Sequence, residues 1–154
     1  MTLENMLLQK LAKWRFPLGT RETLGAEEAG WSIRVDAECA DTVGCRVWEV
    51  TLERPTPLTD DLTARAVRLV ERVTGLLEPL KLLEVDARQG TALLRSVTPK
   101  PLGTALAYYE LLLQAGGGAN VRRYQVERAG GKRQQIGYTL THESLAKLAN
   151  DLTA

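Results

Sequence analysis

The feature that most constrains this chain is a long amphipathic helix followed directly by a β-hairpin. The helix is predicted over residues 59–77, with Thr59 as the N-cap, because apolar residues recur there at spacings of three and four. Pro79 ends it, since a residue that precedes proline is disfavoured in helical conformation. The strands of the hairpin are predicted at Leu80–Asp86 and Thr91–Ser96. A helix with one apolar side must pack on another element, so we expect it to lie on the sheet that this hairpin begins.

Terminal helices are predicted at both ends of the chain. Leu3, Leu7, Leu11 and Trp14 form an apolar stripe that predicts a first helix over residues 2–15. Thr141 is expected to cap a closing helix, because it precedes a helical apolar pattern. The apolar side of this helix consists of Leu145, Leu148, Ala149 and Leu152. We expect both helices to dock on the core, although a terminal amphipathic helix can also bind a second chain.

Strands are predicted on both sides of the central helix. Alternation of apolar and polar residues from Trp31 to Asp36 is typical of a half-buried strand, and a second strand is expected at about Cys45–Arg54. Residues 18–30 are interpreted as a polar connector, and Pro99, Pro101 and Gly103 as a loop. The inner face of the second strand is expected to carry Trp48, Val50 and Leu52. Later strands are expected at Thr104–Gln114, Asn120–Arg128 and near Arg133–Leu140.

These elements predict an α+β fold in one domain that spans residues 1–154. Short connections favour antiparallel pairing. We therefore expect a single antiparallel sheet of about six or seven strands, arranged as a meander, with three helices on one face. The predicted order is helix, two strands, helix, five strands, helix.

The strand at Thr104–Gln114 departs from the usual pattern because it is apolar on both faces. One face carries alanines, Tyr109 and two leucines, and the other carries Leu106, Tyr108, Glu110 and Leu112. Three explanations stay open for this second face. A terminal helix of the same chain covers it, another protein or a second copy binds it, or a small apolar ligand does. An exposed apolar patch of a few hundred Å² usually marks an interaction, so this face is our candidate interaction surface.

No motif for catalysis, a metal or a cofactor is found, and we predict none of these sites. Glu110 is the one acid that we would nominate for proton transfer, and it is otherwise expected to be exposed or paired with an arginine across the sheet. Cys39 and Cys45 flank a predicted turn and are interpreted as two structural thiols, with a redox pair as the alternative.

Nucleic-acid binding is not favoured, although several basic residues and Tyr124 lie close together in the sequence. Neighbouring residues point to opposite faces of a strand, so Arg122 and Arg123 are expected to divide this basic cluster. Its other members are Arg128, Lys132 and Arg133. The net charge of +1 gives no general attraction to nucleic acid or to a membrane. No apolar run has the length of a membrane span, and the first residues lack a signal-peptide pattern, so a cytoplasmic protein is expected.

The order of the first elements, with a closing helix and a chain of 154 residues, resembles the class I chaperones of type III secretion. This resemblance implies a small cytoplasmic α+β dimer that binds an unfolded segment of a secreted protein on apolar surface. Our leading hypothesis is a non-enzymatic protein-binding or chaperone-like module, with a homodimer or a protein client as the partner. The alternative is a small-ligand-binding protein or an enzyme with a pocket between the sheet and the helices.

Overall fold

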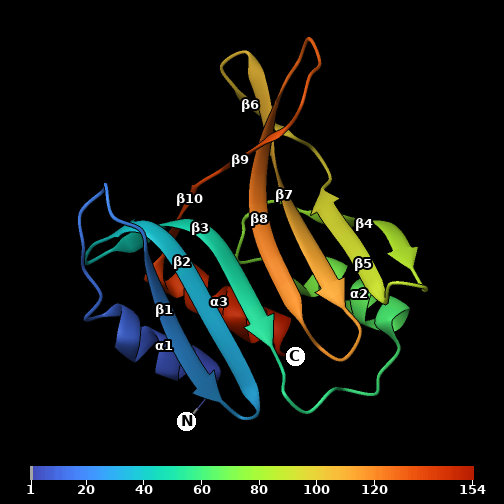
Figure 1. Cartoon of the computed structure of the whole chain (residues 1–154), viewed down its shortest axis with the longest axis horizontal. Helices are drawn as coiled ribbons and strands as arrows, with labels where there is room; N and C mark the ends of the chain where they lie inside the picture. The colour runs from blue at the N-terminus through green and yellow to red at the C-terminus, as the bar shows by residue number, and fades with distance from the viewer. Residues whose placement is uncertain (1) are drawn as a thin grey trace.

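The computed structural model describes residues 2–154, in which three helices lie on one face of a ten-stranded antiparallel sheet (Figure 1). The fold is therefore α+β, as predicted. The helices are α1 (Leu3–Leu11), α2 (Leu62–Arg72) and α3 (His142–Leu152). The strands are β1 (Glu22–Glu28), β2 (Trp31–Ala40), β3 (Gly44–Glu53), β4 (Leu80–Asp86), β5 (Thr91–Ser96), β6 (Lys100–Leu102), β7 (Ala105–Gln114), β8 (Ala119–Glu127), β9 (Gln134–Ile136) and β10 (Tyr138–Thr141).

The sheet has the strand order β1-β2-β3-β8-β7-β5-β4, so its two halves meet where β3 pairs with β8. This junction is short and joins Val50 to Val121 and Leu52 to Ala119. The other end of β3 pairs with β10, while β6 extends the edge of β7 and β9 that of β8. Figure 1 shows that the ends of β7 and β8 project with β6 and β9 as an arm beyond the rest of the sheet.

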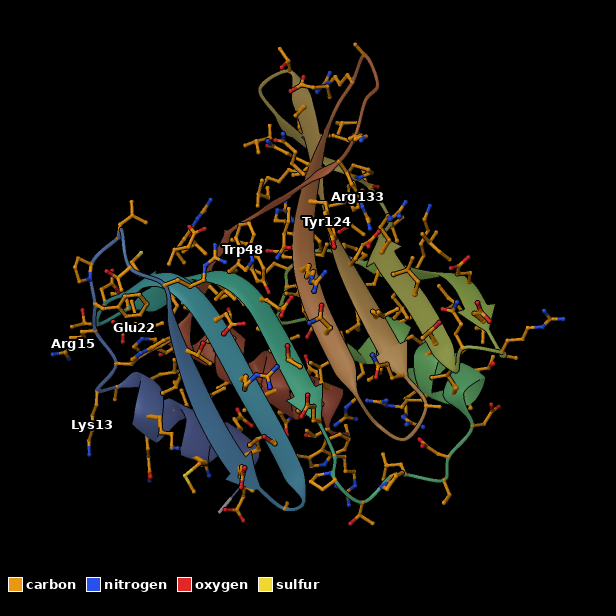
Figure 2. All side chains as sticks on the ribbon, viewed as in Figure 1. Lys13, Arg15, Glu22, Trp48, Tyr124 and Arg133 are labelled. Carbon is orange, nitrogen blue, oxygen red and sulfur yellow. The ribbon has the colours of Figure 1, made fainter. Side chains whose placement is uncertain are left out.

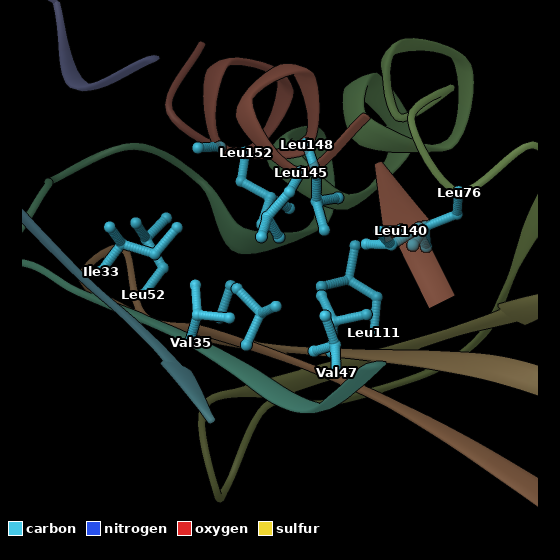
Figure 3. Packing of buried hydrophobic residues seen from close by; sticks show 14 of the residues in the cluster. Ile33, Val35, Val47, Leu52, Leu76, Leu111, Leu140, Leu145, Leu148 and Leu152 are labelled. Atoms are coloured by element: carbon cyan, nitrogen blue, oxygen red, sulfur yellow. The ribbon is translucent and has the colours of Figure 1, made fainter. Parts of the chain in front are cut away.

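The core lies between the helices and the inner face of the sheet (Figure 3). Helix α3 contributes leucines that face Ile33, Val35 and Val47 of the sheet. The stripe predicted for the closing helix is fully buried, and it consists of Leu145, Leu148, Ala149 and Leu152. Thr141 caps α3 as expected, because its Oγ1 accepts a hydrogen bond of 3.1 Å from the backbone N–H of Ser144. Both strands of the predicted hairpin, β4 and β5, have the expected bounds.

The predicted central helix over residues 59–77 was too long at both ends. Asp61 caps α2 by accepting a hydrogen bond from the N–H of Thr63 at 3.2 Å, and the helix ends at Arg72. The following chain is held by α3, since Asp151 accepts a hydrogen bond of 3.2 Å from the N–H of Thr74. The apolar pattern of the sequence continues beyond Arg72 because Leu76 is also buried. Leu76 belongs to the turn that follows the helix and not to the helix itself. The first helix also ends earlier than predicted, at Leu11 instead of residue 15.

The strand count of six or seven was too low, because three short or polar strands carry weak sequence signals. Residues 18–30 contain β1, which pairs with β2 along its whole length although Ala26 is its one buried residue. The proline-containing loop after β5 contains β6, and the expected last strand is divided into β9 and β10. Trp48 was wrongly placed on the inner face of β3. The pairing of β2 with β3 is irregular around Ala37, which changes the alternation and leaves Trp48 half-buried beneath Arg21.

Candidate functional site

Strand β7 presents different residues to the two faces of the sheet. Tyr109, Leu111 and Leu113 belong to the core beneath the helices. Leu106, Tyr108, Glu110 and Leu112 lie on the opposite face, which we call the open face. No helix of residues 2–154 lies over the open face (Figure 1), so the explanation that a terminal helix covers it is wrong.

Side chains of neighbouring strands and loops cover the middle of β7 on the open face. Tyr108 and Glu110 are each 7% exposed, while Leu106 and Leu112 are half-buried. The guanidinium carbon of Arg95 lies 4.8 Å from the centre of the Tyr108 ring. The positive charge of a guanidinium is attracted to the face of an aromatic ring, so this contact both buries the tyrosine and positions the arginine.

Glu110 is the centre of a charged cluster on this face. Its Oε2 atom accepts hydrogen bonds from Nε and Nη2 of Arg95 at 3.0 and 2.6 Å, and from Nη1 of Arg133 at 2.6 Å. The expectation that Glu110 pairs with an arginine across the sheet is confirmed, because Arg95 is its partner residue on β5. Two guanidinium groups thus share one carboxylate oxygen, which compensates the cost of burying this charge.

A second ion pair extends the cluster toward β3. Nε of Arg122 donates a hydrogen bond of 2.5 Å to Oε2 of Glu49. Hydrogen bonds with Tyr124 and Glu49 raise the pKa of Arg122 against a smaller effect of burial. The guanidinium carbon of Arg133 lies 3.9 Å from the centre of the Tyr124 ring. Figure 2 labels both residues on the face toward the viewer. We call this set the Glu110 cluster, and it consists of Glu49, Arg95, Tyr108, Glu110, Arg122, Tyr124 and Arg133.

The Glu110 cluster borders a depression of about 420 Å³ in the open face. Leu93 and Leu112 add apolar surface to it. Glu53 lies at the border of the depression, and its Oε1 atom is 3.9 Å from Nη1 of Arg34. The depression therefore combines half-buried leucines with two arginines that retain solvent contact, since the side chains of Arg122 and Arg133 are 42 and 44% exposed.

The predicted division of the basic residues by β8 is confirmed. Arg122 lies on the open face, whereas Arg123 lies on the helix side, over the ring of Tyr109 at 4.2 Å. Arg123 is also 2.9 Å from Oε2 of Glu78. The sequence did not identify Arg95 or Glu49 as members of one site, because the pairing of distant strands brings them together.

The two cysteines do not form a disulfide in this fold. Both are free, with Cys45 buried and Cys39 partly exposed. In the β2–β3 pairing Cys39 is opposite Arg46 and Cys45 is opposite Ala40, so the two thiols point to opposite faces of the sheet. Burial raises the pKa of Cys45 to about 11.

Within residues 2–154, no group of three or more histidine, cysteine or acidic side chains is arranged to hold a metal ion. In the same part of the chain, no helix has the length and apolar character needed to cross a membrane. No protein-family model, curated protein or solved structure matches this chain. Its function must therefore be argued from the geometry of the open face and of its cavities.

Proposed function

We propose that the protein is a non-enzymatic binding module whose open face holds a segment of a partner protein with acidic and apolar side chains. The observation that carries this proposal is the Glu110 cluster next to half-buried Leu93 and Leu112, on a sheet face that no helix of residues 2–154 covers. Interfaces of this kind combine arginine and tyrosine anchors with apolar contacts.

Charge balance favours an acidic partner. The cluster contains three arginines and two carboxylates, so it carries one positive charge in excess. Oε2 of Glu110 already accepts from both Arg95 and Arg133, and these partly exposed guanidiniums have further N–H groups. A carboxylate of a partner would accept hydrogen bonds from them and neutralise the excess charge.

The same balance disfavours a second copy of this chain as the occupant. A twofold-symmetric dimer through the open face would use the same surface on both subunits. Two clusters with a net positive charge would then face each other, and like charges in an interface are repulsive. A partner segment of opposite charge avoids this cost.

A chaperone-like role is the form of protein binding that we favour. The resemblance to class I type III secretion chaperones implies binding of an unfolded client segment on apolar surface, and the open face offers Leu93, Leu106 and Leu112 for such contacts. The polar lining of the depression gives a client backbone hydrogen-bonding partners, among them Thr51 and Asn120.

Selection from a displayed library of random peptides tests the proposal. We expect enriched peptides to contain Asp or Glu beside apolar residues. Leu112→Asp and Arg133→Gln should each weaken their binding at least several-fold in fluorescence polarisation, and higher salt should weaken it in the wild type. Leu112 is the better target than Tyr108, because Tyr108 is buried beneath Arg95 and its replacement would also disturb packing.

Two control variants carry the same kinds of substitution at positions outside the Glu110 cluster. Leu83→Asp replaces an exposed leucine of β4, and Arg88→Gln removes a charge from the exposed β4–β5 turn. Neither should change peptide affinity. A selection that enriches no peptide, or peptides whose binding is insensitive to both open-face variants, would exclude this function for the open face.

A further inference from the structure

A second cavity, of about 390 Å³, lies on the opposite side of β7 and β8 from the Glu110 cluster. Its walls come from five parts of the chain. These are β7 and β8, the turn between α2 and β4, the short strand β6, the β9–β10 segment, and β3 through Arg46. It is separated from the open face by the thickness of the sheet, so it can bind a ligand independently of the function proposed above.

The cavity contains a buried arginine held by a chain of polar contacts. The side chain of Arg123 is 10% exposed, and its Nη1 atom lies 2.9 Å from Oε2 of Glu78. This contact lacks hydrogen-bond geometry, so Nη1 is buried without a hydrogen-bond partner. Oε1 of Glu78 accepts a hydrogen bond of 2.9 Å from Ser96, whose Oγ accepts one of 2.8 Å from the N–H of Tyr109. Glu78 is thereby fixed beside Arg123, and the Arg123 side chain forms part of the cavity wall.

Positive charge exceeds negative charge around this cavity. Arg46, Lys100 and Arg123 line it together with one acid, Glu78. Arg46 is also 3.8 Å from Glu38, which neutralises part of this excess. At least one positive charge remains without a counter-charge, and a cavity with an excess of one sign of charge attracts ions of the opposite sign.

The other walls are apolar or aromatic. The rings of Tyr109 and Tyr138 meet edge to face, with their centres 5.2 Å apart. Burial raises the pKa of Tyr109, so its phenol stays protonated and can donate a hydrogen bond. Leu76, Leu102 and Ile136 are among the apolar residues of the lining. Such a combination of apolar walls with a few directed polar groups is typical of small-molecule sites.

Leu77 borders the cavity, and its backbone adopts a conformation that is unfavourable for a leucine. Its backbone φ is 61°, in the left-handed region that a leucine rarely adopts, and its side chain is 83% exposed. Backbone strain of this kind is concentrated at ligand sites. An apolar side chain held in water at the border of a cavity can cover the apolar part of a ligand once one is bound.

We propose that this cavity binds a small organic anion, with a carboxylate or phosphate directed at Arg123 and an aromatic or branched apolar body against Tyr109 and Leu102. Lys100 and Arg46 lie where they would attract the same charge. This site has the size for a metabolite. It lies on the side of the sheet opposite the open face, and its charged groups and lining residues are different.

Titration by ¹H–¹⁵N NMR tests the proposal with three probes, namely 3-phenylpropionate, phenyl phosphate and the uncharged 3-phenylpropionamide. We expect the two anions to shift the amide signals of Tyr109, Arg123 and Ile136 with saturable millimolar or tighter affinity, and the amide to bind several-fold more weakly. The better of the two anions identifies the preferred head group.

Lys100→Gln and Arg46→Gln remove charge from exposed positions without breaking the Glu78–Arg123 contact, and each should weaken anion binding several-fold. Arg133→Gln on the open face should leave it unchanged. The proposal is overturned if neither anion gives saturable shifts, if the uncharged amide binds equally well, or if the shifts map to Tyr108 and Tyr124 instead.

Discussion

At the scale of single residues, the carboxylate of Glu110 organises the open face. It is 7% exposed, and an isolated carboxylate at this depth would be strongly disfavoured. Arg95 and Arg133 both donate to its Oε2 atom, and each also lies over a tyrosine ring. The charged groups are therefore held in place by contacts that do not depend on a partner, which lowers the entropic cost of binding one.

Burial also determines the reactivity of the cysteines. The pKa of Cys45 is raised to about 11, and its side chain is 2% exposed, so it stays a thiol at neutral pH. We expect iodoacetamide at pH 8 to modify Cys39 alone in the native protein, and both cysteines after denaturation, as measured by mass spectrometry.

The raised pKa of Cys45 also predicts that the stability of the protein depends on pH. The unfolded chain ionises Cys45 near its ordinary value of 9.0, whereas the folded chain does so near 11. The stabilising contribution of the neutral thiol is complete below pH 9 and is lost as the pH rises toward 11. Cys45→Ala should therefore lose less stability than the wild type between these pH values in urea titrations. A parallel loss in both proteins would contradict this assignment.

At the scale of secondary-structure elements, the contact between the α2–β4 turn and α3 determines where α2 ends. Gly75 passes directly over the backbone of α3, and a Cβ atom placed on it would lie 2.9 Å from the carbonyl oxygen of Ser144. Asp151 of the same helix accepts a hydrogen bond from Thr74. The turn and α3 therefore stabilise one another.

We expect Gly75→Ala to destabilise the protein by roughly 1–3 kcal/mol, because two backbone segments must separate to admit the methyl group. Chemical denaturation measures this change. Gly25→Ala is the matched control, since its nearest neighbour would be 3.9 Å from the new Cβ atom. The control should stay within about 0.5 kcal/mol of the wild type. Equal stability of the two variants would show that the turn can move away from α3.

At the scale of the whole molecule, the fold is two antiparallel halves joined at one short ladder between β3 and β8. The helices cover the inner face across this junction, with α3 packed on α1, β10 and β3. All three helices lie on one side of the sheet (Figure 1), so the other side is left with polar side chains, half-buried leucines and the Glu110 cluster.

This arrangement predicts a monomer. A dimer through the open face would bring two positively charged clusters together. Light scattering on a sizing column should give the mass of one chain, 17.0 kDa. A dimer that Leu112→Asp dissociates would instead identify the open face as a self-association surface, and would exclude an acidic client as its main partner.

Local patterns predicted the elements that carry strong local signals. The β4–β5 hairpin, the cap at Thr141 and the buried stripe of α3 follow from turn residues, capping chemistry and periodicity over a few residues. The same reasoning placed Tyr108 and Glu110 on the face opposite the core strand residues. It failed for β1, whose formation depends on pairing with β2 more than on its own composition.

The sequence by itself determined the fold class, the helix faces and the division of Arg122 from Arg123, because each depends on the period of a helix or strand. Tertiary structure decided the strand order, the displacement of Trp48 and which face of β7 lacks a helix. It also decided the partners of Glu110, since Arg95 and Arg133 reach it from other strands and loops. These features require contacts between residues distant in the chain, and no local pattern records such pairing.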